Sequence, residues 1–309
     1  MSALAMTGGG RMLRRSGGRQ AFIEKLNGMA FCLPATILLL VTCLVPLCVL
    51  VIISFTRYEL GDLDIRFVGL ANFSKALGDP VFRRSLFNTL LYMAIVLPGS
   101  VILGLLVAVL VHGRKRTRSF YEIVYFLPVT STLIAMATVW QFLLHPKIGP
   151  INAFLQLVGL PQHAFLSDPA LALPTLAVVG MWQLIGFNMV LFLAGLSAIP
   201  RDLYEAAEVD GCASAVDRFL TITWPLLGPT MMFVIVTTSI TAFKIFDTVA
   251  VMTRGGPMGS SGVLLYAVYL EGFQYFHTAY AAALTVIFLA FIVVFAVIQT
   301  FVLERRVHY

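Results

Sequence analysis

Long apolar stretches alternate with short polar segments along this chain. Six of the stretches are longer than 20 residues, and an α-helix needs about 20 apolar residues to cross the hydrocarbon core of a membrane. The alternation of apolar and polar positions that membrane-spanning β-strands require is absent. The pattern therefore predicts an all-α membrane protein with six transmembrane helices, at residues 31–55, 86–111, 120–144, 171–198, 226–252 and 278–303.

The polar segment at residues 199–225 is more organised than an ordinary loop needs to be. Pro200 suits the start of a helix, because its missing N–H costs little in the first turn. Residues 201–209 then suit a helix with small and apolar side chains one turn apart. Gly211 allows the positive φ that a sharp reversal requires. We expect two short helices joined at Gly211, forming a compact knob between the fourth and fifth spans.

Composition and charge support a membrane protein and orient it. Hydrophobic residues make up 59% of the chain and charged residues 12%, and the mean hydropathy of +0.92 is far from that of soluble proteins. By the positive-inside rule, both termini, the connection between spans two and three, and residues 199–225 lie in the cytoplasm. The net charge of +6 thus reflects topology and not nucleic-acid binding. The basic residues that set the orientation are Arg11, Arg14, Arg15, Arg19, Lys25, Arg114, Lys115, Arg116, Arg118, Arg305 and Arg306.

The remaining sequence signals point away from an enzyme. Residues 1–27 form a polar cytoplasmic tail before the transmembrane domain at 28–309, and the first apolar stretch is too long for the h-region of a cleaved signal peptide. The four Cys and five His residues show no disulfide or metal-ligand spacing, and no P-loop motif is present. We therefore expect no cofactor, no metal and no catalytic residue, with any ATP hydrolysis in a separate polypeptide.

Residues 199–227, IPRDLYEAAEVDGCASAVDRFLTITWPLL, resemble the cytoplasmic coupling loop of permease subunits in binding-protein-dependent ABC importers. Such loops carry E-A-A, three residues, G, about nine residues, and I-x-L-P. The triplet is Glu205-Ala206-Ala207 and the glycine is Gly211. The gap from Gly211 to Ile222 is ten residues here, and Trp224 replaces the leucine.

Other stretches are similar to the maltose-type sugar permeases of the same family, so that the resemblance covers residues 28–309. It implies the six-helix permease fold of type I importers, in the bacterial inner membrane. It also implies a second homologous permease, two ATPase subunits, an extracytoplasmic solute-binding protein and surrounding membrane lipid as partners. The similar stretches are FLPVTSTLIAMATVWQFLLHPKIGPIN, GMWQLIGFNMVLFLAGLSAIP, FDTVAVMTRGGPMGSSG, AYAAALTVIFLAF and ERRVHY. The residues implied to couple the permease to the ATPases are Glu205, Ala206, Ala207, Asp210 and Gly211.

Polar residues inside the spans indicate where a solute route should be sought. Lys244 and Asp247 are three residues apart in the fifth span, so they either pair with each other or Lys244 offers positive charge to an anionic solute. Amide, hydroxyl and aromatic groups in spans four and five suit a hydroxyl-rich solute, although Thr and Gln also form hydrogen bonds between helices. The candidate solute-contact residues are Gln183, Phe187, Thr238, Thr241, Ala242, Lys244 and Ile245.

The sequence therefore favours the translocating subunit of an ATP-driven importer for a carbohydrate or a similar small polar solute. Glycerol 3-phosphate or another anionic solute is the main alternative, because Lys244 is suited to meet an anion. A secondary transporter would need its own ion-coupling site, and a structural membrane protein would need no solute cavity. Neither of these two classes explains the segment at 199–227.

Overall fold

Helices make up the regular structure of the described part of the chain. The structure is a computed structural model that describes residues 18–61, 64–114, 116–212 and 214–304. Within these ranges the only β-pairing is an isolated antiparallel bridge between Thr56 and Phe67. The all-α class predicted from the sequence is confirmed. The tail up to residue 17, together with Lys115, Arg305 and Arg306, lies outside the described residues.

Residues 1–52 form the first of two structural units, and its described part is helical. Helix α1 (Gly18–Leu39) passes through one π-helical turn, η1 (Leu40–Leu44), into α2 (Val45–Ser54). The residues Glu24–Ser54 are long and apolar enough to cross a membrane. Because every backbone group must be satisfied within the helix in lipid, this apolar run suits a single span.

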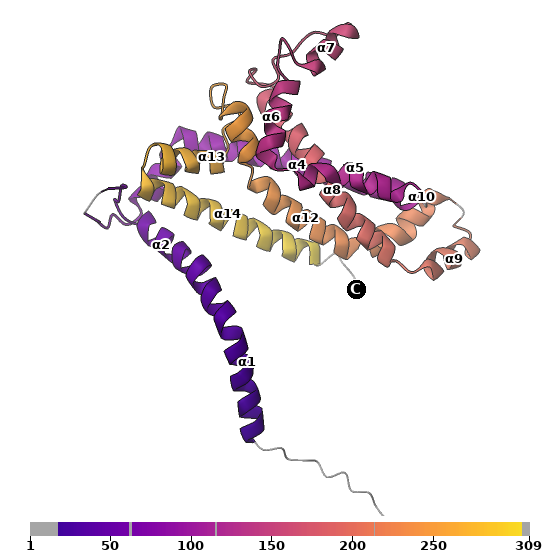
Figure 1. Cartoon of the computed structure of the whole chain (residues 1–309), viewed down its shortest axis with the longest axis horizontal. Coiled ribbons are helices and arrows are strands. Elements are labelled where there is room, and N and C mark those ends of the chain that lie inside the picture. The colour runs from indigo at the N-terminus through magenta and orange to yellow at the C-terminus, as the bar shows by residue number, and fades with distance from the viewer. Residues whose placement is uncertain (1–17, 62–63, 115, 213, 305–309) are drawn as a thin grey trace, which may run out of the picture. The chain divides into compact units, whose positions relative to one another are not determined.

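Residues 53–309 form the second unit, in which α9 and α10 lie at one end and α13 at the other (Figure 1). Its elements are α3 (Ala71–Gly78), α4 (Pro80–His112), α5 (Arg118–Thr130), α6 (Leu133–Leu143), α7 (Pro150–Leu157), α8 (Ala172–Ala198), α9 (Arg201–Val209), α10 (Ala215–Arg218), η2 (Phe219–Thr223), α11 (Trp224–Leu226), α12 (Gly228–Phe243), η3 (Val249–Thr253), α13 (Leu264–Tyr269), η4 (Leu270–Gln274) and α14 (Thr278–Glu304).

The third predicted span, 120–144, is not one helix. Helices α5 and α6 are bent by 98° relative to each other. The bend lies at Ser131 and Thr132, whose backbones are extended with ψ of 146° and 130°. Pro128, three residues earlier, removes one backbone donor near the end of α5. The apolar composition continues across this break, and for that reason hydropathy alone predicts a continuous helix.

The fifth predicted span, 226–252, also differs from one helix. Residues Ala215–Leu226 and α12 are bent by 68°, and α12 ends at Phe243. Lys244 is the C-cap of α12, with its N–H directed at the carbonyls of the last turn. Asp247 therefore follows the helix, and the expectation that Lys244 and Asp247 share one helix is wrong. Among the described residues, four helices are long and apolar enough to span a membrane, or up to six if each bent pair is one span.

The core of the second unit lies between α4, α8 and α12. Helix α8 contacts both α4 and α5, and Gly186 permits the close approach of α5, since a Cβ there would collide with the Tyr125 backbone. Polar side chains join helices inside the bundle, as expected where no water competes. Thr238 of α12 donates to Asn188 Oδ1 of α8 at 2.9 Å, and Gln299 of α14 donates to the Ser239 hydroxyl at 2.8 Å. The largest fully buried side chains include Phe192, Phe243, Leu176, Met189, Leu227 and Leu264.

Candidate functional site

The 199–227 segment begins with the helix that the sequence predicts. Pro200 is the N-cap of α9, with φ −60° and ψ 137°, and the helix covers Arg201–Val209. The preceding Ile199 is buried in the core cluster between α4 and α8. Tyr204 and Ala207 pack against the same cluster. One face of α9 is therefore fixed to the bundle, and the opposite face is left for other contacts.

A Schellman motif ends α9 at Gly211. The Cys212 N–H donates to the Ala207 carbonyl at 2.9 Å, and the Gly211 N–H donates to the Glu208 carbonyl at 3.3 Å. Gly211 has a φ of 93°, a conformation that favours glycine because it has no Cβ. The structure thus confirms the positive φ that the sequence predicts at this residue.

The second half of the segment is tied back to α9. Ser214 caps α10 by accepting a hydrogen bond from the Val216 N–H at 3.2 Å. The Tyr204 and Thr223 hydroxyls lie 2.9 Å apart and share a hydrogen bond. Arg218 lies 3.7 Å from the Glu208 carboxylate, an exposed pair of the kind that typically contributes about 0–1 kcal/mol. The partly buried hydroxyl hydrogen bond and the core packing, more than this ion pair, hold the two helices together.

The outer face of the segment combines acidic and apolar side chains. Glu205, Ala206 and Asp210 are exposed. Val209 is 88% exposed and Leu203 is 42% exposed. These apolar and acidic side chains are free to contact another protein.

A cavity of about 240 Å³ lies between α8 and α12, and we refer to it as the α8–α12 cavity. It brings together five of the seven residues predicted to contact solute. The other two, Phe187 and Thr238, do not line it. The predicted residues that line the cavity are Gln183, Thr241, Ala242, Lys244 and Ile245.

Several polar groups of the α8–α12 cavity are available to a ligand. Within the described part of the chain, the Gln183 amide forms no hydrogen bond with another side chain or the backbone, and no ion pair joins Lys244 to Asp247. The Thr241 hydroxyl donates to the Thr237 carbonyl at 2.9 Å, which leaves its oxygen lone pairs to accept. An amide, a cation, a carboxylate and a hydroxyl acceptor therefore meet at one opening.

Thr238 has a different position from Thr241, although both lie on α12. Thr238 is fully buried and bonded to Asn188, so its hydroxyl serves the contact between α12 and α8. The side-chain nitrogen of Asn188 is itself buried and has no hydrogen-bond partner among the described residues. Phe187 is half-buried on α8 and does not line the cavity.

Sequence reasoning missed some of the cavity lining. Tyr92 of α4, Leu133 of α6 and the buried Thr248 also face the cavity. Tyr92 is a polar aromatic residue inside an apolar span, and this was an available signal. No sequence signal marks Leu133 or Thr248. These residues reach the cavity through the bend before α6 and the break after α12.

Comparisons with known proteins agree with this architecture. A family model described as "Binding-protein-dependent transport system inner membrane component" matches residues 100–309. A probable ABC transporter permease protein of Pyrococcus horikoshii is 34% identical over 239 residues, which cover 77% of this chain and 82% of the relative. The sn-glycerol-3-phosphate transport system permease protein UgpA of Pectobacterium atrosepticum is 35% identical over 251 residues, covering 80% and 83%.

Solved structures show the same fold. A chain of a bacterial alginate ABC transporter, crystallised in complex with an alginate pentasaccharide-bound periplasmic protein, is 22% identical to this chain with a TM-score of 0.80. The superposition covers 91% of this chain and 94% of that chain. At this level of identity the likeness establishes the fold alone, which is the predicted permease fold of type I importers.

Proposed function

The chain belongs to the family of binding-protein-dependent transport system inner membrane components, and we propose that the solute it imports is a carbohydrate or a similar small polar molecule. It is a multi-pass permease of an ABC importer. The cavity that carries the proposal is the α8–α12 cavity, where Gln183, Thr241 and Lys244 present polar groups at one opening. Hydroxyl-rich solutes need such donors and acceptors for orientation.

The size of the α8–α12 cavity supports a path shared with a second subunit. At about 240 Å³ it is smaller than the roughly 300–1,000 Å³ of typical ligand pockets. Thr241 and Lys244 are exposed at its mouth. We infer that a second homologous permease completes the enclosure, so that each permease supplies one wall of the path.

The 199–227 segment is our candidate for the contact with the ATPases. Glu205, Ala206, Ala207, Asp210 and Gly211 carry this proposal. Its outer face holds exposed carboxylates beside exposed apolar side chains, while its inner face is fixed to the bundle. A rigid knob of this kind would transmit movement of two ATPase subunits to α8 and α12, to which it is directly joined. ATP hydrolysis would then take place in those subunits.

The proposed orientation puts the 199–227 segment and both termini in the cytoplasm, and the solute arrives from the opposite side. An extracytoplasmic solute-binding protein would deliver it, a role supported by the alginate transporter crystallised with its periplasmic protein. The basic residues described at this end, such as Arg114, Arg116 and Arg118, support the orientation through the positive-inside rule.

An anionic solute is the second candidate, favoured by one observation. Lys244 is exposed at the cavity and forms no ion pair with any described residue. Several relatives, including UgpA of Agrobacterium fabrum at 34% identity, are sn-glycerol-3-phosphate permeases. Asp247 on the same cavity disfavours a dianion, which leaves a neutral carbohydrate as the first candidate.

Uptake by the complete importer in proteoliposomes tests the proposal and separates the two candidates. We expect ATP-dependent uptake of a neutral sugar that Lys244→Met reduces only modestly. If glycerol 3-phosphate is carried instead, Lys244→Met should abolish its uptake and Lys244→Arg should retain part of it. For a neutral sugar, the double variant Lys244→Met with Asp247→Leu should be no better than the single variant, because the two side chains are not paired. Uptake without ATP would reject the importer assignment.

A further inference from the structure

A second cavity lies at the end of the unit that carries α9 and α10, and the proposed function does not use it. It has a volume of about 630 Å³ and lies among the ends of α4 and α8, the start of α5 and the 199–227 segment. Arg118, Arg201 and Arg218 line it, and its lining residues within the described chain include no carboxylate. We name it the arginine cavity. Its wall is therefore positively charged.

The arginines keep unused hydrogen-bond donors. Arg118 donates through Nε to Glu122 at 2.7 Å, and no other described residue accepts from its two terminal nitrogens. Among the described residues, Arg218 has only the long 3.7 Å pair with Glu208. Arg201 has no ion pair or side-chain hydrogen bond among the described residues. Since each guanidinium carries five N–H donors, the cavity offers many donors to an anion.

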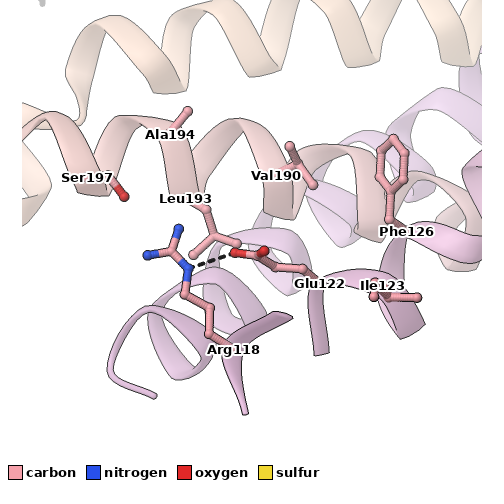
Figure 2. Close-up of a pocket in the computed structure, with 8 residues that line it drawn as sticks. All are labelled: Arg118, Glu122, Ile123, Phe126, Val190, Leu193, Ala194 and Ser197. Atoms are coloured by element: carbon pink, nitrogen blue, oxygen red, sulfur yellow. Dashed lines mark hydrogen bonds and ion pairs between the residues drawn. The ribbon is translucent and has the colours of Figure 1, made fainter. Parts of the chain in front are cut away.

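An apolar groove opens from the same place. It lies between α5 and α8, has a volume of about 440 Å³, and shares Arg118 and Ser197 with the arginine cavity. Figure 2 shows the Arg118–Glu122 pair near Ser197 and the side chain of Phe126 farther along the groove. The other lining residues are Ile123, Val190, Leu193 and Ala194. We call it the α5–α8 groove.

We propose that the arginine cavity and the α5–α8 groove together bind one anionic phospholipid. The phosphate lies among the arginines, whose planar guanidinium groups match phosphate oxygens in pairs, and an acyl chain follows the groove. From Arg118 to Phe126 helix α5 rises about 12 Å, a length that part of an acyl chain can follow. A basic pocket joined to an apolar groove at the end of membrane helices suits a lipid with a charged head.

Because of the position of the site, a bound lipid would link two parts of the protein. Its head would contact α5 through Arg118 and the 199–227 segment through Arg201 and Arg218. A bound lipid would therefore join this segment to the bundle by contacts that the protein alone lacks. Lipid binding is measured without transport, so its loss and a failure of the proposed import function are distinguishable.

Native mass spectrometry of the purified full-length chain, titrated with phosphatidylglycerol or phosphatidylcholine, measures this binding. One basic residue near a lipid surface contributes about fivefold in affinity. We expect Arg201→Gln and Arg218→Gln each to weaken phosphatidylglycerol binding by about fivefold, and the double variant more. The matched control is Arg116→Gln, an exposed arginine of the same end that lines neither the cavity nor the groove. It should leave the affinity unchanged.

A second pair of variants tests the groove without changing charge. Ala194→Trp would fill the α5–α8 groove and should weaken phosphatidylglycerol binding at least fivefold. Val178→Trp adds the same side chain to another exposed position of α8 and should not. Arg201→Lys with Arg218→Lys keeps the charge but loses the paired contacts of the guanidinium, so it should bind more tightly than the double Gln variant and less tightly than the wild type, which separates lost charge from misfolding.

Four results would overturn the proposal. The first is equal loss in Arg116→Gln, which would indicate diffuse surface attraction. The second is unchanged binding in Ala194→Trp. The third is competition by glycerol 1-phosphate as strong as that by the lipid, which would indicate a site for a small anion. The fourth is a cavity variant that loses ATPase assembly while lipid binding stays intact, which would assign the arginines to a protein partner.

Discussion

Replacing Gly211 tests whether the turn after α9 is essential to coupling. Gly211 has a φ of 93°, and no heavy atom lies within 4 Å of the position where its Cβ would stand. A new side chain therefore meets no steric neighbour, and the cost comes from the backbone alone. For alanine this cost is about 1–2 kcal/mol. For a β-branched residue it approaches the upper part of the roughly 1–3 kcal/mol range for strained backbone.

The backbone cost must be compared with the free energy that the hydrogen bonds of the Schellman motif contribute. Two bonds, from Gly211 and Cys212, contribute roughly 0.5–1.5 kcal/mol each. The backbone cost of alanine cancels much of that stabilisation, and the backbone cost of valine can exceed it by about 1–2 kcal/mol. We therefore expect Gly211→Ala to lower the fraction of molecules in which the Schellman motif is formed by about twofold, and Gly211→Val by up to about thirtyfold.

The assay is solute uptake and solute-stimulated ATPase activity of the reconstituted importer, measured on the same preparation. Gly211→Val should reduce uptake far more than Gly211→Ala, and both should insert and purify like the wild type. Gly78→Val is the control, because Gly78 lies in α3 with open space around it and no positive φ. Wild-type uptake in Gly211→Val would refute the reasoning.

Three further outcomes follow from the same structure. Glu205→Lys should reduce assembly with the ATPases while membrane insertion continues, as co-purification would show; normal co-purification would contradict it. Gln183→Leu and Thr241→Val should each lower uptake about threefold to tenfold, since a hydrogen bond to solute is worth roughly 0.5–1.5 kcal/mol; unchanged transport would place the path elsewhere. Leu160→Cys should react with an impermeant thiol reagent outside intact cells and Arg116→Cys should not, and reversed labelling would reject the orientation.

Local signals predicted the 199–227 segment well. The helix at 201–209 has the predicted bounds, because Pro200 and Gly211 act on their own turns and need no distant partner. Gly211 takes the positive φ expected of it for the same reason. Where a residue's conformation depends on its immediate neighbours, the sequence was sufficient.

The breaks in the third and fifth spans could not be predicted in the same way. Hydropathy reports whether a side chain suits lipid or a protein core, and it does not report whether the backbone stays helical. Ser131 and Thr132 interrupt an apolar run without making it polar. The sequence shows that Lys244 and Asp247 are charged. It does not show that the helix ends between them, because both residues are also compatible with a continuous helix.

The candidate cavity was predicted in part. Thr238 and Thr241 of α12 were both predicted to contact solute, yet one is buried against Asn188 and the other is exposed. Residues three apart on a helix differ in direction by about 60°, which is enough to separate an interface from an opening. The position of α8 decides between them, and that position depends on contacts across the whole bundle.

The additional residue in the second half of the 199–227 segment has a structural explanation in η2. A π-helical turn closes its hydrogen bond over five residues, one more than an α-helical turn. In this chain the Trp224 N–H bonds to the Phe219 carbonyl, so the turn contains one residue beyond regular helical register. Ile222 nevertheless stays buried, and Thr223 still reaches Tyr204 of α9. The longer spacing is therefore absorbed on the inner side of the segment, and the contact between its two halves does not depend on a spacing of nine residues.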